Sequence, residues 1–171
     1  EGATLKAGDV IFYDKSNEDV KFVSPVSGTV IEVLRGPKRR IDAIKIQADK
    51  QQSFNDFGKF NTNSDGKTTK AHLLASGCWP FIKQRPYYVI TNPEKSTKLI
   101  FISGYATAPL AADLDFVLQG KEAELQVAVT ALSKLTEGQV HIAVGSNNSP
   151  LANMSDANIH KVSGPHPAGN V

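Results

Sequence analysis

The sequence has few of the residues that build redox and metal centres. Its 171 residues include a single cysteine, Cys78, so the chain alone can form neither a disulfide nor a cysteine-ligated zinc or iron–sulfur site. A lone thiol is typical of a reducing compartment. None of the four histidines, His72, His141, His160 and His166, is paired at a spacing of three or four residues with another ligand type in a convincing metal-binding pattern. We therefore expect no metal site.

Long apolar runs and a charge excess are missing as well. No stretch approaches the ~20 apolar residues of a spanning helix, and the N-terminus lacks the apolar core of a signal peptide. The 19 basic and 17 acidic residues leave a formal net charge of +2, too small to indicate a nucleic-acid partner. We expect no nucleic-acid binding and no direct membrane insertion. Because the chain begins without methionine and ends in a structured pattern, we expect an internal piece of a longer protein.

Short strands are predicted in the first part of the chain, residues 1–50. Apolar or alternating runs cover residues 10–13, 20–23, 30–34 and 41–46. Gly28 and Gly36-Pro37 separate them. A small, curved β-domain follows from this pattern, and it must close on itself or pack on something. The polar residues 51–67 are predicted to be a linker or a surface excursion, pinned by Phe54, Phe57 and Phe60.

Helices and strands alternate in the remainder, residues 68–171. A helix is predicted over residues 68–76, with Ala71, Leu74 and Ala75 on one side and Gly77 after its end. Residues 99–102 and 140–144 are predicted to be buried strands, the first with both faces covered. Residues 122–135 form the predicted helix between them, which Gly138 ends. Strand, helix and strand in this order predict a parallel sheet, and the whole chain is then a mixed α and β protein.

The corner Ser24-Pro25-Val26-Ser27-Gly28 has a proline and a glycine that favour a sharp turn between strands. In this setting it resembles the biotinyl/lipoyl-like barrel-sandwich family. A carrier of that family needs an exposed lysine at a hairpin tip, where Asp14-Lys15-Ser16 falls. Lys15 lies ten residues before Pro25, which is about two more than in the carriers. Asn17-Glu18-Asp19 is predicted to be the additional turn. The default interpretation is a solvated lysine, and a modified Lys15 is the alternative.

The segment from Ser76 to Tyr87 concentrates the only tryptophan and the only cysteine. One interpretation is an apolar site with a cationic rim, suited to a quinone ring or a partner surface. The other is a rigid connector whose aromatics fill the junction between two domains, which is the commoner fate of clustered aromatics. The basic tip Lys38-Arg39-Arg40 similarly fits an acidic partner, lipid headgroups or plain solvation.

A loop after the first predicted parallel strand, residues 103–113, lies where α/β proteins place ligands. It has one glycine and no G-x-G-x-x-G, so a phosphate cradle is not expected. Asp113 is predicted to cap the next helix. We expect no catalytic residue. The candidate quinone or partner contacts are Cys78, Trp79, Phe81, Arg85, Tyr105, Asp113 and His166.

Several motifs follow one another along the chain: Val23–Gly28, Arg35–Arg39, Ser76–Trp79, Arg85-Pro86, Ala108–Asp113, Leu132–Thr136 and Gly164–Gly169. Taken in this order, they resemble the family of A subunits of the bacterial Na⁺-translocating NADH:quinone oxidoreductases. The resemblance covers nearly the whole chain except the polar middle stretch.

The resemblance implies a peripheral subunit on the cytoplasmic face of the bacterial inner membrane. Its partners would be a quinone and the other subunits, which would carry NADH, flavins and iron–sulfur centres. It also implies a Rossmann-like second domain, related to the flavin-binding subunits of complex I and of the Rnf complex. Those relatives hold flavin mononucleotide over a glycine-rich loop, which here has aromatics and proline instead. We therefore expect a domain that kept the fold and lost the cofactor.

The function expected from the resemblance is quinone association and subunit docking within the sodium-pumping complex. The isolated fragment is predicted to be inactive, because it contains no redox centre that could accept a hydride. Two alternatives remain open: a lipoyl or biotinyl carrier domain modified at Lys15, and a flavin mononucleotide-binding oxidoreductase domain.

Overall fold

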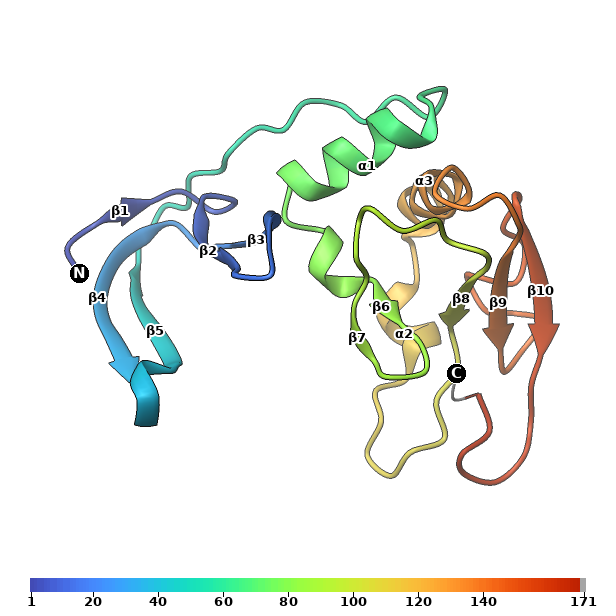
Figure 1. The fold of residues 1–171 in the computed structure, drawn as a ribbon. Helices are drawn as coiled ribbons and strands as arrows, with labels where there is room; N and C mark the ends of the chain where they lie inside the picture. The colour runs from blue at the N-terminus through green and yellow to red at the C-terminus, as the bar shows by residue number, and fades with distance from the viewer. Residues whose placement is uncertain (170–171) are drawn as a thin grey trace. The chain divides into compact units, whose positions relative to one another are not determined.

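The structure is a computed structural model that describes residues 1–169 (Figure 1). It divides into two compact units. The first comprises residues 1–60 and 70–92, and the second comprises residues 61–69 and those from 93 onward.

Antiparallel strands form most of the first unit. β1, β4 and β5 pair in one sheet, and β2 and β3 form a separate hairpin. All four strands predicted from the sequence are confirmed. The strands are β1 (Thr4–Leu5), β2 (Val10–Asp14), β3 (Asn17–Val23), β4 (Gly28–Arg35) and β5 (Ile41–Ala48), with the 3₁₀ turn η1 (Pro37–Arg39) between the last two.

The corner before β4 is fixed by hydrogen bonds and by close packing. Buried Ser27 donates its backbone N–H to Gln52 Oε1 at 2.7 Å, and its Oγ accepts from the Ser53 N–H at 3.0 Å. Gly28 has φ +157°, and a Cβ there would lie 2.1 Å from the Gln47 carbonyl oxygen. Only glycine therefore fits this corner.

Two expectations for the first unit are wrong. Asn17, Glu18 and Asp19 are not extra turn, because they belong to β3, and Asp14 pairs with Asn17 across the exposed Lys15-Ser16 turn. The ring of Phe54 does not pin the middle stretch, because it is exposed. Phe60 packs against the His72 ring at 5.6 Å between centroids, and backbone bonds between Ala7 and residues 53 and 55 fasten the stretch to the first unit.

Between residues 66 and 90 the chain forms one helix and several short elements: α1 (Gly66–Ala75), η2 (Trp79–Phe81), β6 (Lys83–Gln84) and β7 (Val89–Ile90). Asp65 caps α1, since its Oδ1 accepts the Thr68 N–H at 2.8 Å. Hydrogen bonds from the Thr68 side chain and backbone lower the pKa of Asp65. Gly77 ends the helix with φ +70°, as predicted. The predicted apolar side is wrong: Ala71 and Ala75 are exposed.

A three-stranded parallel sheet, ordered β10-β9-β8, is the centre of the second unit. The predicted strand–helix–strand unit is confirmed as β8, α3 and β9, while the sequence pattern does not indicate β10. The elements are β8 (Ile100–Ser103), α2 (Leu114–Leu118), α3 (Glu122–Ser133), β9 (Val140–Val144) and β10 (Ala157–Lys161).

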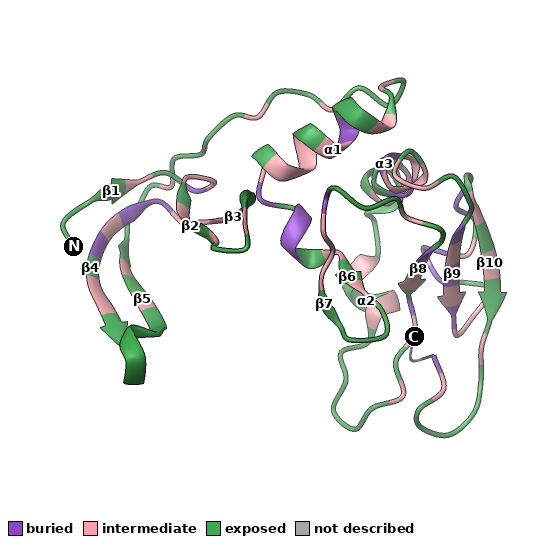
Figure 2. Ribbon diagram, viewed as in Figure 1, coloured by how far each residue is buried: buried purple, intermediate pink, exposed green. Residues whose placement is uncertain are grey.

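Within residues 1–169, the core covers one face of this sheet and leaves the other open. Ile100, Val140 and Ile142 point into the core, where they pack with Val129 of α3. Phe101 lies on the opposite face and is 54 % exposed, so the prediction that this strand is covered on both sides is wrong. Buried and intermediate positions alternate along β9, whereas β10 has only intermediate and exposed positions (Figure 2).

Gly138 does not end α3, which stops at Ser133. A Cβ at Gly138 would lie 2.1 Å from the Lys98 carbonyl oxygen. This glycine therefore permits a close approach between two chain segments.

Candidate functional site

The loop after β8 lies against the segment Gly164–Gly169. Ser103 Oγ donates to the Gly169 carbonyl oxygen at 2.6 Å, and Thr107 Oγ1 donates to that of Ala168 at 2.8 Å. Thr107 Oγ1 is also 3.4 Å from Nδ1 of exposed His166. Two motifs about 60 residues apart, one with Tyr105 and one with His166, are thus brought together at the carboxyl end of β8.

Tyr105 fills the space beside this strand end. A Cβ built on Gly145 would lie 2.4 Å from Cδ2 of the Tyr105 ring, and one built on Gly169 would lie 2.8 Å from Cδ1. The ring is therefore fitted against two glycine backbones. An aromatic ring therefore occupies part of the region beyond the carboxyl end of this strand, where α/β proteins bind ligands.

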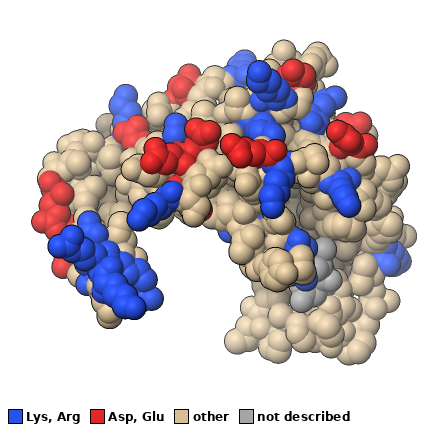
Figure 3. Space-filling view, viewed as in Figure 1, with Lys and Arg blue, Asp and Glu red and all other residues tan. Residues whose placement is uncertain are grey.

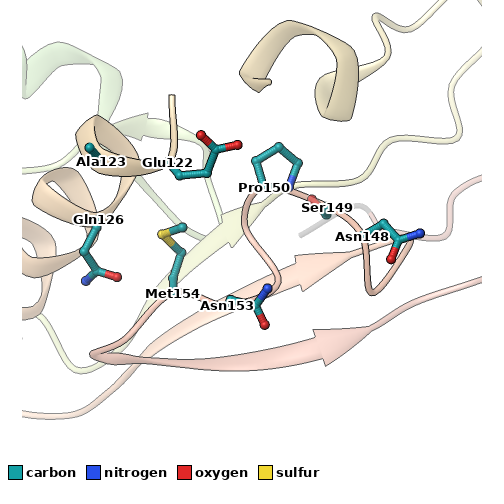
Figure 4. Close-up of a pocket in the computed structure, with 8 residues that line it drawn as sticks. All are labelled: Glu122, Ala123, Gln126, Asn148, Ser149, Pro150, Asn153 and Met154. Atoms are coloured by element: carbon teal, nitrogen blue, oxygen red, sulfur yellow. The ribbon is translucent and has the colours of Figure 1, made fainter. Parts of the chain in front are cut away.

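A nearby pocket lies between the start of α3 and the segment after β9 (Figure 4). Amide and hydroxyl groups line it together with the carboxylate of Glu122, and no lysine or arginine is among its lining residues. Glu122 and Glu124 also occupy the first turn of α3, where their charges oppose the binding of a phosphate. This pocket suits a neutral hydrogen-bonding group. Its lining residues are Glu122, Ala123, Gln126, Asn148, Ser149, Pro150, Asn153 and Met154.

An apolar groove runs over the open face of the sheet, with three rings along it. Phe101 stacks on His141, with centroids 5.2 Å apart and planes 20° apart, and His141 stacks on His160 at 5.1 Å and 28°. His141 Nδ1 and His160 Nε2 are 2.8 Å apart. The groove is lined by Leu99, Phe101, Ile102, His141, Ala143, His160, Val162 and Gly169.

Sequence spacing does not reveal this histidine pair, because the two residues lie 19 positions apart. Only the parallel register of β9 and β10 places His160 beside His141. The sequence predicts that His141 is packed or at an edge, and the structure places it half-buried on the central strand. Among residues 1–169 the structure places no group of three or more potential metal ligands together.

The end of η2 and the following hairpin of β6 and β7 present aromatic side chains to solvent. Phe81 is 83 % and Tyr87 81 % exposed, and Tyr88 and Arg85 are exposed beside them in the chain. Aromatic and arginine side chains are enriched at the energetic centres of protein interfaces. We call this set of four residues the aromatic hairpin.

Trp79 is placed quite differently from its neighbour Phe81. It is 2 % exposed, and its indole Nε1–H donates to the Thr91 carbonyl oxygen at 2.7 Å. The turn that carries it contacts β3. Trp79 therefore belongs to the core of the first unit, whereas the neighbouring thiol of Cys78 is exposed.

The candidate residues are divided between the two units. Cys78, Trp79, Phe81 and Arg85 lie in the first unit, and the rest lie in the second. Asp113 caps α2, its Oδ1 accepting the Phe116 N–H at 3.2 Å, as predicted. Tyr105 and His166 are brought close by the hydrogen bonds of Ser103 and Thr107.

Comparison with known proteins defines the class of each part. Residues 1–49 match the family model described as the NqrA N-terminal barrel-sandwich hybrid domain, and residues 64–171 match the NqrA second alpha/beta domain. The chain therefore combines a barrel-sandwich hybrid domain with an α/β domain.

Relatives matched along the full chain identify the family. The chain is 36 % identical over 173 residues to the A subunit of the Na(+)-translocating NADH-quinone reductase of Vibrio anguillarum, covering 99 % of this chain and 39 % of that protein. It is 36 % identical over 171 residues to the same protein of Vibrio vulnificus strain YJ016, covering 98 % and 38 %. The chain belongs to the NqrA family, and it spans about two fifths of the length of these relatives.

Proposed function

We propose that this chain is part of the NqrA component of a Na⁺-translocating NADH:quinone reductase, in which it contributes subunit docking and quinone association. The observation that carries the proposal is the match along 99 % of the chain to a protein of that name. No helix within residues 1–169 has the length and apolar character needed to cross a membrane. We place the protein peripherally, on the cytoplasmic face of the membrane complex.

Docking to other subunits is assigned to the aromatic hairpin. Large aromatic rings that are more than four-fifths exposed, as Phe81 and Tyr87 are, lose apolar surface to water when a partner covers them. Arg85 adds a donor group that pairs with a carboxylate or a backbone carbonyl of the partner. Trp79 supports this surface from within the unit, since its turn contacts β7.

Quinone association is assigned to the groove on the open sheet face. A quinone ring is flat and apolar with two carbonyl oxygens, so it needs an aromatic surface and hydrogen-bond donors. Phe101 supplies an exposed ring, and the adjacent imidazoles of His141 and His160 supply N–H groups. Tyr105 lies on the loop after β8 and His166 on the segment Gly164–Gly169, at one end of this sheet. Gly169, the last residue of that segment, also lines the groove.

The α/β domain is proposed to be Rossmann-like and related to the flavin-binding subunits of complex I, without a flavin of its own. Its parallel strands and the α3 crossover fit that fold. The tyrosine ring against Gly145 and Gly169 and the two glutamates opening α3 oppose a phosphate-bearing cofactor. We place the domain boundaries at residues 1–50 and 68–171, and assign NADH, flavins and iron–sulfur centres to other subunits.

Docking is tested by replacing Phe81, Tyr87 and Tyr88 with serine in the full-length protein, expressed together with the rest of the complex. We expect at least about a tenfold drop in the amount that co-purifies with the membrane subunits, because each ring is placed as an interface anchor. The control replaces Phe54 and Phe116, which are also exposed, and retains co-purification. Equal retention by both variants would contradict the assignment.

A further inference from the structure

The hairpin tip between β4 and β5 carries four basic residues within six positions: Arg35, Lys38, Arg39 and Arg40. No acidic residue occurs from position 34 to position 41. Figure 3 shows these side chains as a cluster of positive charge at the end of the hairpin. The tip is exposed at every one of the four basic positions.

Only one of these four charges is neutralised nearby. Arg40 Nε lies 2.8 Å from Asp42 Oδ1, and that carboxylate also packs against the Gly36 backbone. Arg35 donates from Nη1 to the Arg39 carbonyl oxygen at 3.2 Å, a contact that leaves its charge unpaired. Among the described residues no ion pair involves Arg35, Lys38 or Arg39. Three positive charges therefore face solvent together.

The backbone holds these charges in a defined loop. Lys38 and Arg39 have φ of +56° and +61°, a region that non-glycine residues seldom adopt. The Gly36 N–H donates to the Arg40 carbonyl oxygen at 2.8 Å and closes the loop. The tip therefore presents its cations from an ordered turn.

Exposed apolar side chains flank the charges on both strands. Leu34 and Ile41 are exposed next to the loop, and Ile31 is exposed further along β4. Ile41 is the direct cross-strand partner of Arg35, so these two side chains lie on the same face of the hairpin. Cationic groups beside exposed aliphatic groups are the composition that binds at the surface of an anionic bilayer.

We propose that the β4–β5 hairpin tip binds the surface of an anionic phospholipid bilayer. The cations attract lipid phosphates, and Leu34 and Ile41 enter the headgroup region. A protein partner is less well suited, because a stable interface covers about 800 Å² and roughly 20–30 residues on each side. A single hairpin tip is too small to provide that interface. The inference goes beyond the proposed function and does not require it, because a chain without other subunits would still bind lipid.

The test is co-sedimentation of the 171-residue chain with vesicles of phosphatidylcholine alone or with roughly one quarter phosphatidylglycerol. We expect binding only to the anionic vesicles, and its loss near about 0.5 M salt, where the screening length is only a few ångströms. A triple variant, Arg35→Gln, Lys38→Gln and Arg39→Gln, should bind about a hundredfold more weakly, since each charge is worth about fivefold.

A matched control separates a site from general charge. Lys50→Gln, Lys59→Gln and Lys95→Gln change three exposed lysines elsewhere and shift the net charge by the same amount. This control should retain most of the binding, and Leu34→Ser with Ile41→Ser should weaken it while leaving the salt dependence. Circular dichroism checks that each variant is folded. Equal loss in the control, no preference for anionic vesicles, or binding to polyglutamate in place of vesicles would overturn the proposal.

Discussion

Trp79 and Phe81 stand two positions apart in one 3₁₀ turn and have opposite environments. Trp79→Ala should cost about 3–5 kcal/mol of unfolding free energy, because the indole fills the core of the first unit and its N–H is hydrogen-bonded. Phe81→Ala should change it by no more than about 0.5 kcal/mol, because that ring is exposed. Urea denaturation followed by circular dichroism measures both. A Phe81 effect as large as that of Trp79 would show that the ring is packed.

The sequence predicts single residues well where the requirement is local. The end of α1 at Gly77 and the cap of α2 by Asp113 depend on neighbours in the chain, and both are confirmed. The prediction for Gly138 fails because its role depends on the Lys98 carbonyl, about 40 positions away. Nothing in the order Trp-Pro-Phe indicates which ring is buried, since that depends on packing against β3 and β7.

Elements are predictable where a hydrophobic pattern runs for four or more residues. The strands over residues 10–13 and 140–144 and the helix α3 have such patterns and are confirmed. β6 and β7 have two residues each, too few for a period to appear. The continuous apolar run at residues 99–102 predicts two covered faces, yet Phe101 remains exposed. A continuous apolar run therefore does not distinguish a strand covered on both faces from one covered on a single face.

The groove across β8, β9 and β10 gives a prediction at this same scale. A water-soluble ubiquinone analogue should shift the imidazole NMR signals of His141 and His160 in a saturable way, because both imidazoles line the same groove as Phe101. The signals of His72, in the first unit, should not move. Phe101→Ala should weaken binding by up to about tenfold, the worth of one aromatic stack.

A matched variant tests the location of this binding. Phe116→Ala removes an exposed ring of the same unit that does not line the groove, and it should leave the affinity unchanged. Shifts confined to Phe81, Arg85, Tyr87 and Tyr88 would instead place the quinone at the aromatic hairpin, and the groove assignment would then be rejected.

At the scale of the whole molecule, the order of strands and helices in the sequence indicates two regions. The residue contacts show in addition that the chain, after leaving the first unit, returns to it for residues 70–92. Residues 70–92 follow the polar stretch in sequence, and they pack with the first unit through η2 and β3. Burial of Trp79 holds them there. Composition cannot reveal this return, because the contacts join residues more than about 50 positions apart in the chain.

Both units bury apolar side chains, Val20, Val30 and Trp79 in the first and the cluster around Ile142 in the second, so we expect the two to unfold separately. Ile142 is fully buried in the second unit, and Ile142→Ala should cost about 2–5 kcal/mol there. Trp79 is the only tryptophan and reports on the first unit. In urea, Ile142→Ala should lower the midpoint of the part of the circular dichroism change that comes from the second unit. It should leave the midpoint of the tryptophan fluorescence change in place. Val20→Ala, in the first unit, should shift the fluorescence midpoint instead. If Ile142→Ala moved both signals together, the two clusters would form one cooperative structure.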